Sequence, residues 1–416
     1  MKRAACFLAI LMLFFPGASA LESRDELRSL YNEIAPFQES SPYEEVPSLE
    51  RPYTMGRISA DAQREALAYL NFLRRLADLE PVETNEVYTF ECQHGAMLMA
   101  IEDDVEHMLP QPRGMDDAFY AEASAALASS NVARFNWMRP NILREAVAYF
   151  IRDDGEANLP VLGHRRWLLN PNMGQTGFGL ANSSSGMTYV ALYAHDMIDA
   201  PVSWSEVCWP SEGVFPCELM HGHLAWSIML DPDEYDVPGS DIAVVLRETV
   251  SGAEFVFYCS SGMGNGFCAV NQQAYARSAC VIFRPDLETA GITDYLQNQI
   301  WEVDVTGLKG ADGRERELNY TVQMVSLYVQ EVFAVELSCP SATLRRGDSM
   351  RLSAEVVPSY ADDLSIIWTS SDETVAMVGN DGTVRAVSPG MCVITAASAN
   401  GCLDSCAITV EEGAGG

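Results

Sequence analysis

The 416-residue chain carries 58 acidic side chains against 26 Lys and Arg, which gives a formal net charge of −32. A surface this acidic repels phosphate backbones, so the composition excludes a general nucleic-acid-binding protein. With 48% hydrophobic and 20% charged residues, the chain has enough apolar material for packed cores, and its length suggests two to four domains. Wholesale disorder and a polytopic membrane protein are excluded by the same composition.

The first twenty residues have the three-part pattern of a secretory signal peptide. Lys2 and Arg3 form a basic start, residues 4–15 are apolar, and residues 18–20 read Ala-Ser-Ala, a cleavage motif. The apolar run is too short to span a bilayer, and no later run reaches that length. We therefore expect a secreted, extracellular protein with no membrane span.

Cysteine spacing marks two candidate disulfides, each closing a hairpin. Cys208 and Cys217 bracket a turn with proline, and Cys259 and Cys268 bracket a glycine-rich turn. An oxidising compartment favours such bonds. Four more cysteines cluster in the last segment: Cys339, Cys392, Cys402 and Cys406. Spacing leaves the connectivity open, and the lack of a CxxC pair gives no support to a zinc ribbon or a thioredoxin-type site.

Periodicity and turn residues predict an α+β chain. Apolar residues at helical spacing predict four helices before residue 155, whereas short apolar runs between Gly, Pro, Asp and Asn predict strands from about residue 200. The expected segments are a signal peptide (1–20), a polar linker with one short helix (21–57), a helical domain (58–200), a β-rich extension (201–332) and an all-β unit (333–412).

Motifs in the helical domain resemble the CAP superfamily of cysteine-rich secretory, antigen-5 and pathogenesis-related proteins. The specific part is Gly-His-Arg-Arg-Trp at 163–167, followed by Gly-Phe-Gly at 177–179. It is preceded in order by His107-Met108-Leu109-Pro110, by Ser-Ser-Asn at 129–131 and by Asp-Asp-Gly at 153–155. The resemblance covers about 60–200 and is to the bacterial SCP-like extracellular form. It implies an α-β-α sandwich.

The all-β unit resembles a group 2 bacterial Ig-like domain. The motif residues are Trp-Thr-Ser-Ser-Asp-Glu at 368–373, Val-Ala at 375–376, and Gly-Thr-Val-Arg-Ala-Val at 382–387. Short strands separated by turns every 8–12 residues are typical of such sandwiches. The resemblance implies a spacer domain, with carbohydrate or host-surface adhesion as the alternative role.

The CAP resemblance also implies a cleft where two histidines and two acidic residues meet, and where some members bind a divalent metal. By position the histidines are His107 and His164, and the later acid is Asp153, with Asp154 as a one-residue alternative. Imidazoles and carboxylates suit zinc-like ions, so His107 and His164 are the expected ligands of a possible divalent metal. His107 also fits a helix C-terminal cap.

The first acidic position of the family departs from its usual residue. Ser130, followed by Asn131, stands where much of the family has glutamate, and Glu122, about two helical turns upstream, is the candidate substitute. Trp167 is expected in the core. Arg165 and Arg166 are expected to pair with Asp153 and Asp154 in a structural role, with substrate binding as the alternative.

Three functions follow from this layout. We favour a binding protein without assigned catalytic residues, whose partner is a small apolar ligand, a glycan or a cell-surface component. The alternatives are a metal-assisted hydrolase that uses His107, His164 and Asp153, and an adhesin that acts through the Ig-like unit. The ligand and the oligomeric state stay open.

Overall fold

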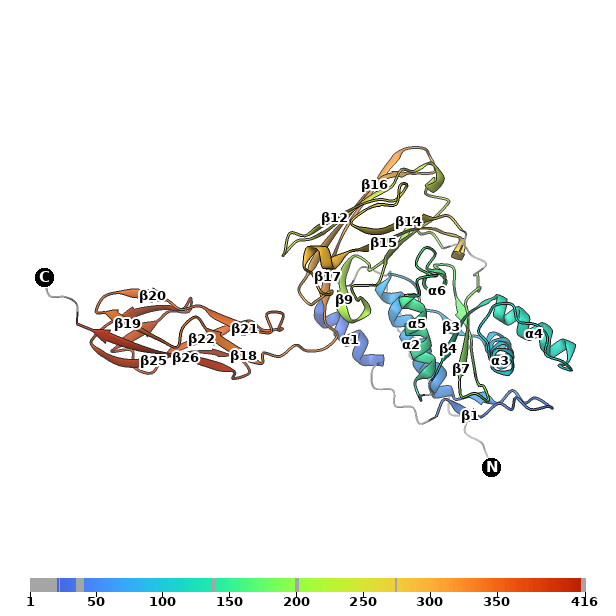
Figure 1. Ribbon diagram of the computed structural model, residues 1–416, viewed down its shortest axis with the longest axis horizontal. Helices are drawn as coiled ribbons and strands as arrows, with labels where there is room; N and C mark the ends of the chain where they lie inside the picture. Colours follow the sequence, from blue (N-terminus) through green and yellow to red (C-terminus); the bar gives the residue numbers. More distant parts are fainter. Residues whose placement is uncertain are drawn as a thin grey trace, which may run out of the picture. The chain divides into compact units, whose positions relative to one another are not determined.

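The computed structural model describes residues 21, 23–34, 41–136, 139–198, 202–273 and 275–412. The chain folds into two compact units (Figure 1). The first unit comprises Met1–Tyr295 and Gln299–Val325, and the second comprises Leu296–Asn298 and Ser326–Gly416. The expected signal peptide lies outside the described residues. No helix in the described part is long and apolar enough to cross a membrane.

The helical part of the first unit is an α-β-α sandwich, as expected. Its antiparallel sheet has the order β4 (Ser130–Phe135), β7 (Thr188–Tyr193) and β6 (Phe178–Asn182). Helices α3 (Glu86–Glu102) and α4 (Asp117–Ala128) pack together on one face of the sheet (Figure 1). Buried residues from both layers, including Met97, form a continuous core.

Two further helices cover the other face. Helix α2 (Ala60–Leu76) packs along α5 (Ile142–Arg152), whose apolar residues lie on one stripe (Figure 1). Ser59 caps α2 by accepting a hydrogen bond from the backbone of Ala62 at 3.1 Å. The six-residue α6 (Gly163–Leu168) follows α5 and carries the Gly-His-Arg-Arg-Trp motif. Two short strands, β3 (Glu83–Thr84) and β5 (Gln175–Thr176), pair in parallel nearby.

The segment expected as a polar linker contributes to the first unit. It contains the expected helix, α1 (Arg24–Ile34), whose Leu27 is fully buried. The ring of Tyr31 lies 5.6 Å from that of Phe72 on α2. Farther along, β1 (Tyr43–Glu45) pairs with β2 (Arg57–Ile58). The segment is therefore not only a linker. A few of its apolar side chains pack in the first unit, although its overall composition is polar.

The β extension is a sandwich of two sheets within the same unit. The four-stranded sheet has the order β14 (Gly266–Asn271), β15 (Ala279–Pro285), β10 (Trp226–Leu230), β8 (Glu206–Trp209). The six-stranded sheet has the order β13 (Met263–Gly264), β12 (Glu254–Tyr258), β11 (Ala243–Glu248), β16 (Ile300–Lys309), β17 (Glu315–Val325), β9 (Gly213–Pro216). Aromatic rings meet between them: Trp226 lies 6.2 Å from Trp301, and Phe257 lies 5.6 Å from Phe283.

One of the two expected disulfides forms. Cys259 and Cys268 are bonded, but they do not close a simple hairpin, because β12 and β14 belong to different sheets. The bond therefore links the two layers of the sandwich covalently. The expected pairing of Cys208 with Cys217 is absent, since both are unbonded. Cys208 lies on β8 of the four-stranded sheet, while Cys217 directly follows β9 of the six-stranded sheet.

The second unit is an all-β sandwich, as expected. Its sheets are β18-β21, β19-β26-β25-β22 and β20-β24-β23. The strands are β18 (Ala334–Leu337), β19 (Ser341–Arg345), β20 (Ser349–Arg351), β21 (Ala354–Val357), β22 (Ile366–Ser370), β23 (Ala376–Val378), β24 (Thr383–Ala386), β25 (Gly390–Ser398) and β26 (Leu403–Glu411). Trp368 packs against the unit's core, and Gly382 has a positive φ of 79° where a Cβ would strike Leu352 O.

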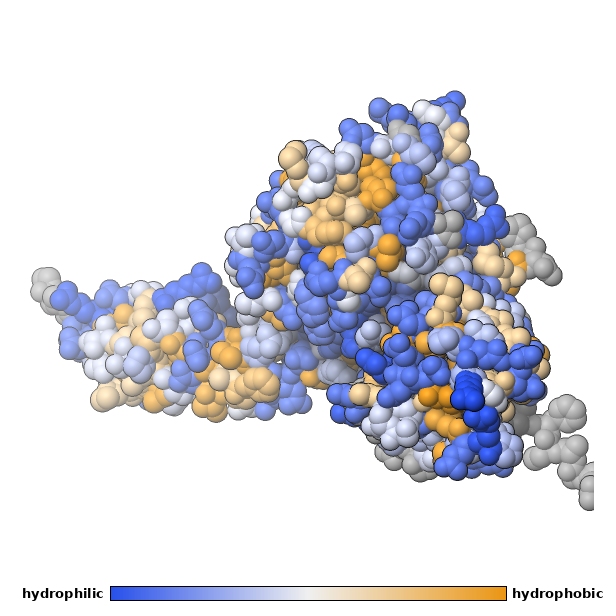
Figure 2. Space-filling view, turned by 45° about the vertical axis from the view of Figure 1, so that its right-hand side comes forward, coloured by the Kyte–Doolittle hydropathy of each residue, from blue (hydrophilic) through white to orange (hydrophobic). Residues whose placement is uncertain are grey.

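Hydrophilic residues cover much of the face shown in Figure 2, and apolar residues appear there as separate patches. This distribution agrees with the excess of acidic side chains in the chain. Packed apolar residues instead form the cores described above.

Two buried arginines of α6 join the helical part to the β extension. Arg165 donates to Ile151 O at 2.8 Å, to Arg152 O at 2.9 Å and, across the boundary, to Ala225 O at 2.7 Å. The expected pairing with Asp153 and Asp154 is not made by this guanidinium, whose hydrogen bonds go to three backbone carbonyls and to Ser227 Oγ. Burial lowers the pKa of Arg165 to about 10, which still leaves it charged at neutral pH.

The side chain of Arg166 makes the second connection. It donates to Asn271 Oδ1 at 2.8 Å and to Gln273 O at 2.7 Å, and it also reaches Ser278 O. Its guanidinium lies 5.1 Å from the ring centre of Tyr275, which adds a cation–π contact. Arg166 therefore fixes the part of the β extension that faces α6.

Replacing Arg165 with methionine should destabilise the first unit by about 3–5 kcal/mol, because several buried carbonyls lose their donor at once. Denaturant unfolding followed by tryptophan fluorescence measures this loss. Arg314→Met is the matched control, since the Arg314 side chain is 81% exposed. Its effect should stay within about 0.5 kcal/mol. Equal unfolding midpoints for the two variants would contradict this role of Arg165.

Candidate functional site

A cavity of about 490 Å³ lies where the helical part of the first unit meets the β extension. Its wall combines side chains from α6, from the end of α4 and the start of β4, and from the loop before β15. The lining residues are His107, Ala128, Ser130, Asn131, Asn158, Val161, Gly163, His164, Trp167, His195, Gln273 and Tyr275. Its size is in the range of small-molecule sites.

His164 is held in the wall by a buried carboxylate. Asp153 is only 3% exposed and ends α5 in a left-handed conformation, with φ of 49°. Its Oδ1 lies 2.9 Å from His164 Nδ1, and its Oδ2 accepts the backbone N–H of His164 at 3.0 Å. Asn158 Nδ2 donates to the same carboxylate at 2.8 Å. Because a carboxylate beside Nδ1 favours a proton there, Nε2 is left as the acceptor nitrogen.

His107 also lines the cavity. Its Nδ1 donates to Leu127 O at 2.8 Å, one of the last carbonyls of α4. The expected capping role thus applies to α4, while α3 ends five residues earlier at Glu102. This bond does not engage the other ring nitrogen, Nε2. His107 and His164 are both among the residues that line the cavity.

A third imidazole, His195, lines the cavity and was missed by the sequence argument. It follows β7, and its backbone N–H donates to Ser129 O at 3.2 Å. Its ring lies 4.0 Å from that of Trp167, which lines the cavity and is only half-buried, so the expectation of a core tryptophan is wrong. A histidine directly after a buried strand was the available signal. Burial, and then the nearby His107, lower the pKa of His195.

The remaining predicted residues divide between the cavity and the surface. Ser130 and Asn131 line the cavity, Ser130 Oγ lies 3.4 Å from Cys92 Sγ, and Asn131 Nδ2 donates to His164 O at 3.0 Å. Glu122 is exposed on α4 and is not among the lining residues, so it does not take the place of the family glutamate there. Asp153 is not among the lining residues, but its carboxylate contacts His164, which is.

The charge of the lining differs from that of the chain. The lining residues include three imidazoles and three amides but no Asp or Glu, although the chain has 58 acidic residues. Among the residues that the structure describes, no group of three or more His, Cys, Asp or Glu side chains is placed to hold a metal ion. The cavity therefore presents nitrogen atoms and aromatic surface to a ligand.

The β extension closes one side of the cavity at close range. A Cβ at Gly163 would lie 3.2 Å from the ring of Tyr275, so glycine lets α6 approach this wall. Arg166 holds the carbonyls of Gln273 and Tyr275 from behind. The site is thus shared by two segments far apart in sequence.

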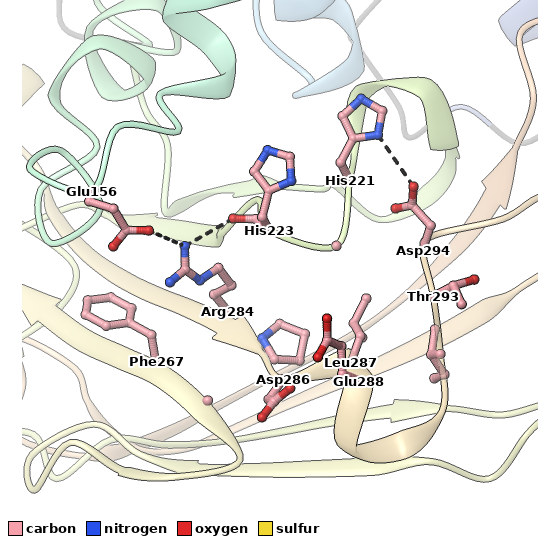
Figure 3. A pocket seen from close by; sticks show the side chains of 14 residues that line it. Glu156, His221, His223, Phe267, Arg284, Asp286, Leu287, Glu288, Thr293 and Asp294 are labelled. Atoms are coloured by element: carbon pink, nitrogen blue, oxygen red, sulfur yellow. Dashed lines mark hydrogen bonds and ion pairs between the residues drawn. The ribbon is translucent and has the colours of Figure 1, made fainter.

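A second cavity of about 710 Å³ lies by the His221-Gly222-His223 turn (Figure 3). Two pairs of its side chains lie within ion-pair distance: His221 Nδ1 lies 3.7 Å from Asp294 Oδ2, and Arg284 Nη1 lies 3.4 Å from Glu156 Oε1 (Figure 3). Arg284 also donates to His223 O at 3.3 Å. The lining of this second cavity contains both basic and acidic side chains, so it favours no particular class of ligand. The lining of the cavity at His164 contains no acidic side chain.

Comparison with protein families identifies two parts of the chain. Residues 67–193 match the cysteine-rich secretory protein family, and residues 331–406 match the bacterial Ig-like domain (group 2). The first match contains every candidate site residue named from the sequence.

Similar curated proteins match over short stretches. Lacto-N-biosidase of Bifidobacterium bifidum is 40% identical over 70 residues, which are 17% of this chain and 6% of that enzyme. Kappa-carrageenase of Pseudoalteromonas carrageenovora is 38% identical over 81 residues, which are 19% of this chain and 20% of that enzyme. Because the chain spans so little of their length, their activities are not assigned to it.

Solved structures give weaker likenesses. Domains 4 and 5 of an S-layer protein share 17% identity and a TM-score of 0.18, covering 29% of this chain and 68% of that one. Two tandem Ig domains of titin share 8% identity and a TM-score of 0.24, covering 45% and 88%. Scores this low carry no argument about function.

The ring of His195 should titrate below the ordinary histidine pKa of about 6.5, because it is partly buried and faces His107. His107→Gln should move its midpoint upward by removing the second imidazole. A pH titration of the histidine ring signals by NMR measures both effects. His221→Gln, outside the cavity, is the control and should leave His195 unchanged. An unaltered midpoint in His107→Gln would show that the two rings do not interact.

Proposed function

Because the chain carries a cysteine-rich secretory protein (CAP) domain and a group 2 bacterial Ig-like domain, we propose that it is a secreted binding protein. The two domains support an extracellular interaction protein, and the ligand site is the finer part of the proposal. We place this site in the cavity of His107, His164 and His195. The Ig-like unit serves as a spacer that presents the CAP domain.

One observation carries the ligand proposal: an imidazole oriented by a buried carboxylate faces a cavity without acidic lining residues. Such a lining favours a ligand group that donates a hydrogen bond, because Nε2 of His164 is left as an acceptor nitrogen there. Trp167, Tyr275 and Val161 supply apolar surface for the rest of the molecule. The proposed ligand is therefore a small amphipathic molecule with a hydroxyl head that donates a hydrogen bond and an apolar body.

1-Octanol is a suitable probe because it has a hydroxyl head and an apolar chain, and ethanol provides the head with almost no apolar body. Isothermal titration calorimetry should detect binding of octanol but not of ethanol. His164→Leu should weaken octanol binding by about threefold to tenfold, since a neutral hydrogen bond is worth about 0.5–1.5 kcal/mol. His223→Leu, in the other cavity, is the matched control and should bind as the unaltered chain does.

Asp153→Asn should weaken octanol binding in the same direction, because an amide cannot orient the Nδ1–H of His164 as a carboxylate does. The same titration measures this effect, with Asp154→Asn as its neighbouring control. Absence of octanol binding to the unaltered chain would overturn the proposal. Turnover of an ester or peptide substrate that His164→Leu abolishes would favour an enzyme over a binding protein.

A further inference from the structure

Two cysteines of the Ig-like unit lie in near-bonding positions. Cys339 Sγ and Cys406 Sγ are 3.9 Å apart, although their sequence separation is 67 residues. Cys339 lies between β18 and β19 and is half-buried, whereas Cys406 on β26 is fully buried. Both belong to the cluster that forms the unit's core.

The backbones beside the two sulfurs are already held together. Strand β19 pairs in parallel with β26, with Ser341 opposite Ala407 (Figure 1). The backbone N–H of Ala407 donates to Pro340 O at 2.9 Å, directly between the two cysteines. Closing the sulfur gap to the disulfide length of about 2 Å therefore requires side-chain rotation and little backbone movement.

The other thiols of the unit are less well placed. In the β25–β26 pair Cys406 lies opposite Ile394, and Cys392 lies opposite Ile408. Cys392 is thus a diagonal neighbour of Cys406, a relation that separates residues by roughly 7–8 Å. Cα atoms that far apart cannot be bridged without backbone movement. The sulfur of Cys402 donates to Val332 O at 3.2 Å, beside a different cluster.

We propose that Cys339 and Cys406 form a disulfide that closes the Ig-like unit into a covalent loop. The bond forms by exchange with an external disulfide, such as glutathione disulfide in an oxidising compartment. The thiolate of Cys339 attacks that disulfide and releases one thiol, and the thiolate of Cys406 then displaces the second from the mixed disulfide. Two thiols of the chain are oxidised, and one external disulfide is reduced to two thiols.

The order of attack follows from burial. Burial, reinforced by the neighbouring Cys339, raises the pKa of the Cys406 thiol to about 11, which makes it the poorer first nucleophile at neutral pH. The half-buried Cys339 is more accessible to an external disulfide. Cys406 then reacts inside the core, where the mixed disulfide on Cys339 lies next to it.

The bond has a mechanical consequence for a spacer. Tension between residue 334 and the C-terminal end of β26 would pass through the disulfide and not through the strands between residues 339 and 406. Those strands could no longer be pulled out, so the unit would resist extension even if its core loosened. This consequence goes beyond the proposed ligand binding and does not depend on it.

Peptide mapping of the full chain tests the bond directly. The purified chain is incubated with glutathione disulfide, free thiols are blocked under denaturing conditions, and the unreduced digest is analysed by mass spectrometry. We expect a Cys339–Cys406 peptide beside the Cys259–Cys268 peptide. Cys339→Ser should lose only the first, and Cys392→Ser, which changes a buried thiol of the same core, should keep both. Recovery of Cys406 as a blocked thiol, or its linkage to Cys392, would overturn the proposal.

Single-molecule pulling of the full oxidised chain gives a second, independent readout. The fully stretched chain should be shorter than the Cys339→Ser chain by roughly 220 Å, the extended length of the enclosed segment. Cys392→Ser should match the unaltered chain. Equal lengths for the unaltered and the Cys339→Ser chains would refute the covalent loop even if both fold normally.

Discussion

The first unit depends on two adjacent guanidinium groups that are buried without carboxylate hydrogen-bond partners. Arg165 and Arg166 are each less than 1% exposed, and backbone carbonyls accept most of their side-chain hydrogen bonds. A buried cation is costly unless its donors are satisfied. Because acceptors such as Ala225 O and Gln273 O belong to the β extension, the helical part and the extension cannot separate without leaving these charges unpaired. This constraint makes the two parts one compact unit.

The same constraint builds the cavity. Helix α6 turns one neighbouring pair of side chains, Arg165 and Arg166, toward the extension, while His164 and Trp167 line the open space. Asp153 accepts hydrogen bonds from both the His164 side chain and the first backbone N–H groups of α6, at His164 and Arg165. One carboxylate thus sets the start of the helix and the direction of the imidazole. Its burial behind His164 also keeps negative charge out of the lining.

The Ig-like unit follows a different physical logic. It has its own core, which Trp368 and the hydrophobic residues of β25 and β26 share, so it can be stable without the cavity-bearing unit. In the proposed function it serves as a spacer outside the cell, and the proposed Cys339–Cys406 disulfide would limit its extension. In the cavity-bearing unit, the Cys259–Cys268 disulfide links the two layers of the β extension.

Local sequence determined much of this protein. Helical spacing located α2 to α5, turn residues marked the strands, and the Gly-His-Arg-Arg-Trp motif identified the segment that carries His164. These features depend on neighbours within a few residues, which a single sequence displays. The resemblance to the CAP family also named His107, Ser130 and Asn131, which line the cavity.

Tertiary structure decided the rest, because it depends on residues far apart in the chain. No local pattern indicates that the ring of His195 contacts that of Trp167, that Tyr275 lines the cavity, or that Glu122 is not among its lining residues. Cys208 and Cys217 looked like a hairpin pair, yet their strands lie in different sheets. Sequence determined which groups are present and on which elements. Packing between distant segments decided which of them meet, and therefore which chemistry the cavity presents.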